Sequence, residues 1–282
     1  MEINNKYEII KKISHGCFSS VYLGIDKTTK NQVVLKVENR CQSQSMLQRE
    51  LFILKVLRPT MGRKIIDILD WGNTNTHRYL VFPYIGFSLA DCLQKRQKMS
   101  EKMVMTIGNQ LLTSLEIIHD QDVLHGDISP HNILLTKCCE DNQLKSFFID
   151  FGCSALVEQI KLNQEISSGS PCFSSPFCNE GKIFSYRDDL LSLFFVLAYA
   201  NLGYLPWQKG CYNKSVKFIK SNHHEYLYKE PLPKMLKIAI EYTSHLEEGE
   251  RPNYDMLKEI IKPRGNIFSN DLKGNQQSDL YL

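Results

Sequence analysis

Two acidic side chains and one amide follow short apolar runs, where they could perform metal-assisted chemistry. Asp127 ends a short, mostly apolar stretch, and Asn132 follows it by five positions. Asp150 follows a second apolar pair, Phe148-Ile149. A carboxylate can orient a hydroxyl nucleophile, and amide and carboxylate oxygens are the hard ligands that Mg²⁺ prefers. The spacing therefore predicts magnesium-dependent phosphoryl transfer, with Asn132 and Asp150 holding the metal.

A lysine within an apolar strand is the second candidate for chemistry. Lys36 lies in the run 32–37, where an ammonium is costly unless it meets an anion. Glu50, on the helix expected next, is the natural partner, and the pair would hold the ammonium against nucleotide phosphates. The residues alone leave an equal alternative, in which Lys36 reaches solvent and Glu50 is a solvated helical residue.

A third candidate is the loop of small residues between Ile13 and Val21. Its backbone N–H groups could approach phosphate oxygens, although Gly16 is its single glycine. The alternative is a plain hairpin turn with a buried Phe18.

Hydrophobic periodicity predicts the elements that would position these side chains. A β-rich part comes first, and a helical part follows it. The predicted strands are 7–13, 20–25, 32–37, 65–70 and 78–82, with one helix over 43–57 that Arg58-Pro59 ends. The predicted later helices are 89–97, 101–119, 187–202, 214–221, 233–242 and 254–261, and His223-His224 is expected in a surface turn.

Composition narrows the class of protein. The 282 residues include 34 basic and 31 acidic side chains, so the net charge of +3 gives no indication of nucleic-acid binding. No segment has the pattern of a signal peptide or a membrane span. The nine cysteines are scattered and contain no Cys-x-x-Cys pair, which predicts unpaired thiols in a reducing, intracellular compartment.

Taken together, these motifs resemble the eukaryotic protein kinases from about residue 7 to residue 262. The order and spacing of all the motifs match those of the protein-kinase motifs. The set comprises the loop around Gly16, Val33-Val-Leu-Lys36, Glu50, His125-Gly-Asp127 with Asn132, and Asp150-Phe-Gly152.

Four segments of the second half are similar to the casein kinase 1 group, which includes the vaccinia-related kinases. They are Gly169-Ser-Pro-Cys-Phe-Ser-Ser175, Tyr186-Arg-Asp-Asp-Leu-Leu-Ser-Leu193, Tyr204-Leu-Pro-Trp-Gln208 and Ile85-Gly-Phe-Ser-Leu89. The resemblance implies a serine/threonine protein kinase that uses ATP and Mg²⁺, acts on a protein substrate and works as a monomer in the cytoplasm, the nucleus or both.

The resemblance also implies an α+β, bilobal fold. The kinase domain would span residues 1–262, with an N-lobe at 1–82, a hinge at 83–87 and a C-lobe at 88–262. Residues 263–282 would form a flexible tail.

Roles for individual residues follow from the same resemblance. Asp127 would orient the acceptor hydroxyl, Lys36 would hold the phosphates, and Glu50 would position Lys36. Asn132 and Asp150 would bind magnesium. Phe82 would be the gatekeeper, and Ile85 would supply the hinge N–H. The expected nucleotide contacts are Ile13, Ser14, Gly16, Val21, Val34, Lys36, Glu50, Phe82, Pro83, Ile85 and Leu134.

Three positions depart from the pattern. Gly126 replaces an arginine that captures a phosphorylated activation loop, which predicts activity without that phosphorylation. Ser129 replaces a catalytic lysine and can donate a hydrogen bond but no charge, which predicts slower catalysis. Cys172 replaces a basic residue, so a preference for acidic or phosphorylated sites is not carried over.

Two other functions stay open at this point. The His-Gly-Asp sequence followed by a residue other than lysine is also similar to choline and aminoglycoside kinases, which phosphorylate small molecules. Ser129 and the glycine-poor loop would suit a pseudokinase that binds partners and turns over little substrate.

Overall fold

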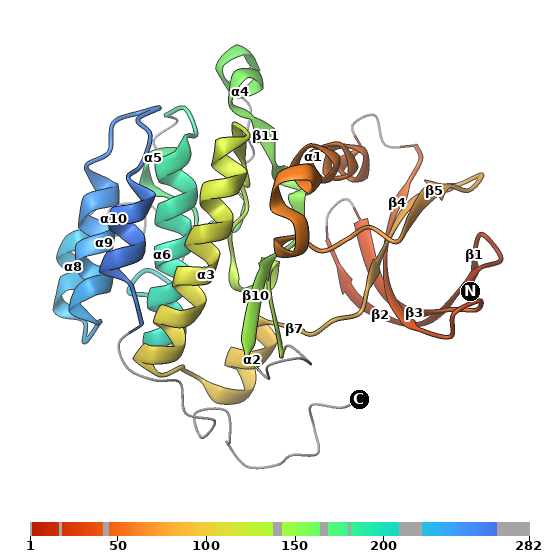
Figure 1. Cartoon of the computed structure of the whole chain (residues 1–282), viewed down its shortest axis with the longest axis horizontal. Coiled ribbons are helices and arrows are strands. Elements are labelled where there is room, and N and C mark those ends of the chain that lie inside the picture. Colours follow the sequence, from red (N-terminus) through yellow and green to blue (C-terminus); the bar gives the residue numbers. More distant parts are fainter. Residues whose placement is uncertain are drawn as a thin grey trace.

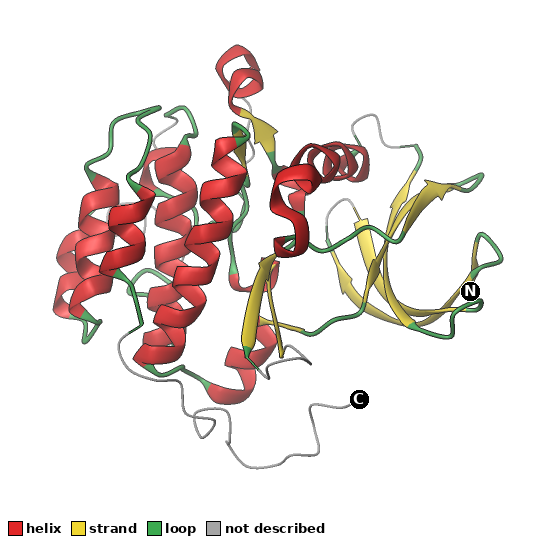
Figure 2. Cartoon of the chain, in the orientation of Figure 1, coloured by secondary structure: helices red, strands yellow, loops and turns green. Residues whose placement is uncertain are grey.

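The protein has a curled sheet at one end and a group of helices at the other, with helix α1 between them (Figure 1). Strands dominate the first part of the chain, and helices dominate the second (Figure 2). The structure, a computed structural model, describes residues 2–16, 19–41, 45–137, 143–163, 169–179, 182–208 and 222–263. The expected tail from residue 264 onward and the helix expected at 214–221 lie outside these residues.

Six strands form the first sheet, in the order β1-β2-β3-β4-β6-β5, and neighbouring strands are antiparallel. They are β1 (Glu2–Ile3), β2 (Tyr7–His15), β3 (Ser19–Asp26), β4 (Gln32–Asn39), β5 (Asp70–Asn73) and β6 (His77–Pro83). Val33, Leu35 and Val37 of β4 pack in a small core on one face of the sheet. Because side chains alternate along a strand, Lys36 points to the other face.

Helix α1 (Met46–Met61) follows strand β4 in sequence and begins after the capping residue Ser45. The sequence predicted a helix over 43–57 that ends at a proline, but the helix continues through Pro59. Met61, in the last turn, is buried in the main hydrophobic core. Packing therefore stabilises this turn although the proline lacks an N–H.

The strand predicted at 65–70 is wrong, because strand β5 begins only at Asp70. Ile65 is buried in the main core and Ile68 packs against it. The apolar residues of this segment thus contact the core without forming a strand, which explains the misleading pattern.

The described residues that follow the first sheet are mainly helical. Their helices are α2 (Leu89–Arg96), α3 (Glu101–Asp120), α4 (Val157–Asn163), α5 (Pro176–Asn179), α6 (Tyr186–Leu202), α8 (His223–Lys229), α9 (Lys234–Ser244) and α10 (Tyr254–Ile260). Helix α6 is apolar on most sides and lies in the main core together with α3 and α9. His223 starts α8 and is buried, with Nε2 2.8 Å from Ser244 Oγ. The surface turn predicted there is therefore wrong.

Short strands and turns lie between the sheet and the helices. They are β7 (Phe87–Ser88), β8 (Val123–Leu124), β9 (Ile133–Lys137), β10 (Leu144–Phe148) and β11 (Ala155–Leu156), with single-turn 3₁₀ helices at η1 (Gly62–Lys64), η2 (Pro130–Asn132) and η3 (Phe151–Cys153). Strand β9 pairs with β7 and β10, and β8 pairs with β11. These pairings bring Asp127, Asn132 and Asp150 onto neighbouring loops.

Two further expectations concern cysteines and membranes. Among the described cysteines, Cys172 is disulfide-bonded, so the prediction of unpaired thiols is wrong at this residue. Cys41, Cys92, Cys153 and Cys178 are free. Over the described ranges, none of the helices has the length and apolar character needed to cross a bilayer.

Candidate active site

Lys36 lies between two carboxylates. Its Nζ atom is 2.7 Å from Glu50 Oε2 and 2.6 Å from Asp150 Oδ1. The Lys36 side chain is 9% exposed and that of Glu50 is 3% exposed, so the alternative in which Lys36 reaches solvent and Glu50 is solvated is wrong. The pairing gives the buried ammonium the anions that it needs.

Burial and charge act in opposite directions on these three groups. Burial alone would lower the pKa of Lys36, but Glu50 and Asp150 raise it above its ordinary value. Burial also opposes ionisation of Asp150, yet the Lys36 ammonium holds the pKa of this carboxyl below its ordinary value. Burial, together with the Asp150 charge, outweighs the opposing effect of the Lys36 ammonium and raises the pKa of Glu50 to about 6.

The Glu50 carboxyl should therefore make activity depend on pH. Its pKa lies above the ordinary 4.5, so the carboxylate is lost as the pH falls through about 6 and Lys36 then keeps one ionised partner. A Glu50→Gln variant imitates the protonated form. We expect the ratio of wild-type to variant kcat/KM for ATP to be large at pH 8 and to shrink toward one below pH 6. A ratio that stays constant across this range would contradict the assignment.

The face of the sheet that carries Lys36 also carries apolar candidates for a nucleotide contact. Val21 lies opposite Lys36 on β3, and Phe82 lies opposite Val34 on β6. All three apolar residues are half-buried. Apolar side chains beside a positioned charge are typical of a ligand site that holds a ring and an anionic group.

The loop between β2 and β3 is partly described. Ser14 pairs with β3, and the register shift before it makes Ile13 the extra residue of a β-bulge, 49% exposed. The Gly16 N–H donates to the Ser19 carbonyl over 2.9 Å. Residues 17 and 18 lie outside the described part, so the alternative of a buried Phe18 stays untested.

The connector after the sheet begins within a strand. Pro83 is the last residue of β6, and the Tyr84 N–H donates to the Gln32 carbonyl over 3.4 Å. Ile85 follows Tyr84 in the connector, and its role as the N–H donor to adenine stays a prediction. Leu134 lies half-buried on β9, beside strand β7.

The Asp127 carboxylate is held by two N–H donors. Asn132 Nδ2 lies 2.9 Å from Asp127 Oδ2 and also donates to the Asp127 carbonyl. The Ser170 N–H donates to Asp127 Oδ1 over 2.9 Å. Ser170 is not among the predicted site residues, although its place after Gly169 in a motif that resembles the casein kinase 1 group was a signal.

Gly169 lets the chain approach this carboxylate closely. A Cβ atom at this residue would lie 2.0 Å from Asp127 Oδ1 and 2.3 Å from its Cγ. Any other residue would have to displace either the carboxylate or the chain. Gly169 therefore leaves room for the Asp127 carboxylate beside the chain, where it accepts from the Ser170 N–H.

A buried aspartate on α6 braces the loop that carries Asp127. Asp189 accepts from the His125 N–H over 2.6 Å and from the Gly126 N–H over 3.0 Å. Gly126 has a φ of +80°, and a Cβ there would lie 2.6 Å from the Cys153 carbonyl oxygen. The glycine thus suits a left-handed conformation in a crowded place. The His125 ring packs beside Phe151, with centroids 4.9 Å apart.

Asn132 and Asp150 fit the needs of a divalent cation. The Ile149 N–H donates to the Asn132 carbonyl over 2.9 Å, which ties the two loops together. Asn132 uses its Nδ2 group toward Asp127, which leaves Oδ1 as a possible ligand. The two contacts of Asp150 with Lys36 and Gly152, in the part of the chain described, both use Oδ1. Two oxygens thus suit Mg²⁺, which commonly takes its remaining ligands from phosphates and water.

Ser129 is buried, with 1% exposure, in an extended conformation before η2. Its carbonyl accepts from the Asn132 N–H over 3.0 Å. The residue thus supports the loop through its backbone, and its side chain brings no positive charge to the site.

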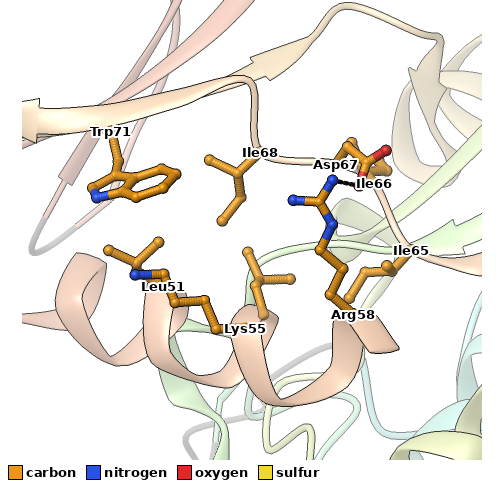
Figure 3. Close-up of a pocket in the computed structure, with 9 residues that line it drawn as sticks. Leu51, Lys55, Arg58, Ile65, Ile66, Asp67, Ile68 and Trp71 are labelled. Carbon is orange, nitrogen blue, oxygen red and sulfur yellow. Dashed lines mark ion pairs between the residues drawn. The ribbon is translucent and has the colours of Figure 1, made fainter. Parts of the chain in front are cut away.

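A separate pocket lies between α1 and residues 65–71 (Figure 3). Lys55 lies over the Trp71 ring, and Arg58 pairs with Asp67 over 3.4 Å. The pocket holds about 60 Å³, well below the roughly 300–1,000 Å³ of ordinary ligand sites. It is therefore too small for a nucleotide.

The family comparison agrees with this geometry. A model of the protein kinase domain matches residues 7–264, and the chain belongs to the protein kinase family. The predicted α+β, bilobal kinase fold is thereby confirmed. Protein kinases are phosphotransferases that act on proteins and generally use ATP with Mg²⁺. Membership does not favour the pseudokinase alternative.

Proposed function

We propose that this chain is a serine/threonine protein kinase of the casein kinase 1 type, which transfers the γ-phosphate of ATP to protein hydroxyls. The observation that carries the proposal is the position of Lys36, whose Nζ bridges Glu50 and Asp150. Asp127, held by Asn132, then orients the acceptor hydroxyl.

The other site residues have binding roles in this proposal. Asn132 and Asp150 hold Mg²⁺, which neutralises phosphate charge when bound. Phe82 and the Ile85 N–H face the adenine. The remaining contacts to the nucleotide come from Ile13, Ser14, Gly16, Val21, Val34, Pro83 and Leu134.

Contacts in the second half of the chain support the casein kinase 1 assignment. The Trp207 indole of the Leu-Pro-Trp segment donates to the Cys172 carbonyl over 2.7 Å. Asp188 accepts from the Ser185 N–H over 2.7 Å, and the Ser175 hydroxyl also donates to it. The motif residues behind the resemblance thus support one another physically.

Domain limits, assembly and location complete the proposal. The kinase domain spans 1–262, with lobes at 1–82 and 88–262 joined by a hinge at 83–87. By the same resemblance, the protein would be a monomer in the cytoplasm, the nucleus or both. Light scattering of the purified chain and imaging of a tagged copy test the last two points.

One assay separates the candidate functions. Radiolabelled ATP and Mg²⁺ are supplied with a mixed protein pool and a panel of small alcohols, and the protein is used before and after phosphatase treatment. We expect label in protein, unchanged by phosphatase because Gly126 offers no arginine to bind a phosphorylated loop. Label in small alcohols alone would support the small-molecule kinase, and nucleotide binding without transfer would support the pseudokinase.

A Ser129→Lys variant should turn over faster than the wild type. The added ammonium would neutralise charge on the transferring phosphoryl group, and we expect kcat to rise about tenfold. Ser129→Met, which adds similar length without charge, is the control for the burial of this residue. Equal rates in the two variants would contradict a role for the missing charge.

A further inference from the structure

Glu38, two residues after Lys36 on β4, contacts the start of helix α1. Its Oε1 accepts from the Met46 N–H over 2.9 Å, and its Oε2 accepts from the Ser45 hydroxyl. Glu38 is 1% exposed. A buried carboxylate with two donors from the first residues of a helix acts as a cap supplied by a neighbouring strand.

Helix α1 needs this anion because its first turn contains no acidic residue. The N-terminus of a helix carries unsatisfied N–H groups and a partial positive charge, which an anion stabilises. The Ser45 hydroxyl oxygen accepts from the Gln48 N–H over 3.1 Å, and the same hydroxyl donates to Glu38. The serine therefore links the start of the helix to the Glu38 carboxylate. Arg78, opposite Glu38 on β6, places Nη1 3.5 Å from Oε2. This ion pair places a positive charge beside the buried carboxylate.

The strand holds the helix at two points. Lys36 and Glu38 are two residues apart on one face of β4, a rise of about 6.6 Å. Their partners Met46 and Glu50 are four residues apart on one face of α1, a rise of about 6 Å. The two spacings match, so both contacts form together. A shift of the helix by one turn would break both.

We propose that Glu38 is a positioning residue for phosphoryl transfer, which sets the Lys36–Glu50 pair by fixing the start of α1. The inference rests on the proposed kinase function. The start of α1 also lies against the Asp150 loop, since a Cβ at Gly152 would lie 3.6 Å from the Met46 Cβ. Glu38 thus acts on both partners of Lys36 through the helix.

A double-mutant cycle with Glu50 tests this role. We expect Glu38→Ala to lower kcat/KM for ATP about tenfold in the wild-type background. In the Glu50→Gln background, where the Lys36–Glu50 ion pair is already lost, the same change should lower it less than about twofold. Glu101→Gln, which removes an exposed acid from the first turn of α3, should change neither value.

Thermal melting accompanies each measurement. Equal losses in both backgrounds, or no loss in the wild type, would overturn the positioning role and leave Glu38 as a stabilising cap. If Glu38→Ala fails to fold, Ser45→Ala enters the same cycle, because it removes one donor to Glu38 and keeps the carboxylate. A wild type without any transfer would instead refute the kinase function, so the two failures are distinguishable.

Discussion

An Asp127→Asn variant is expected to lose phosphoryl transfer to protein by about 10²–10⁴-fold, the usual contribution of a positioned general base. In the wild type, both carboxylate oxygens accept an N–H, from Asn132 on one side and from Ser170 on the other. An asparagine has one oxygen and one NH₂ group, so one of these donors would face another donor. The variant also lacks the negative charge that orients an acceptor hydroxyl.

Binding of Mg·ATP should survive this change, because Lys36, Glu50 and Asp150 stay in place. Calorimetric titration of the variant with Mg·ATP, beside steady-state kcat, separates the two effects. A variant that keeps the wild-type kcat would show that Asp127 does not orient the acceptor.

Gly169→Ala is expected to lower kcat about 10²-fold, because small displacements of catalytic groups cost rates of this order. The added methyl group would lie 2.0 Å from Asp127 Oδ1, a distance that forces the carboxylate or the chain to move. The contact from the Ser170 N–H to Asp127 would then break. The KM for ATP should change little, since the added methyl group meets Asp127 and not Lys36.

Ser170→Ala serves as the comparison for this variant, since it keeps the backbone N–H and removes only the hydroxyl. It should lose less activity than Gly169→Ala. Steady-state kinetics with ATP and a protein substrate provide both constants. A Gly169→Ala enzyme with unchanged kcat would mean that the segment yields without moving Asp127.

The candidate-site residues that could be predicted all stand out in the sequence immediately around them. Lys36 is a charge within an apolar strand, and Asp127, Asn132 and Asp150 follow apolar runs at fixed spacing. Patterns of this kind can be recognised within a few consecutive residues. The partner of Lys36 could be proposed because Glu50 lies on the next helix, and the structure brings the two together at 2.7 Å.

Contacts between distant segments could not be predicted from these patterns. Ser170 reaches Asp127 across 43 residues, and Glu38 caps a helix that starts eight residues later on another element. Both contacts depend on where the fold places a backbone N–H, and the residue types alone do not indicate that position. The fold predictions failed for a similar reason at 65–70, where contacts with the core produced an apolar pattern without a strand.

The most direct test of the account is the chemical identity of the product. A protein substrate is incubated with the chain and Mg·ATP, and mass spectrometry locates any new phosphate, with Asp127→Asn as the control. The account predicts phosphoserine or phosphothreonine that disappears in the control. Phosphate that persists in the control, or none in the presence of bound ATP, would contradict it.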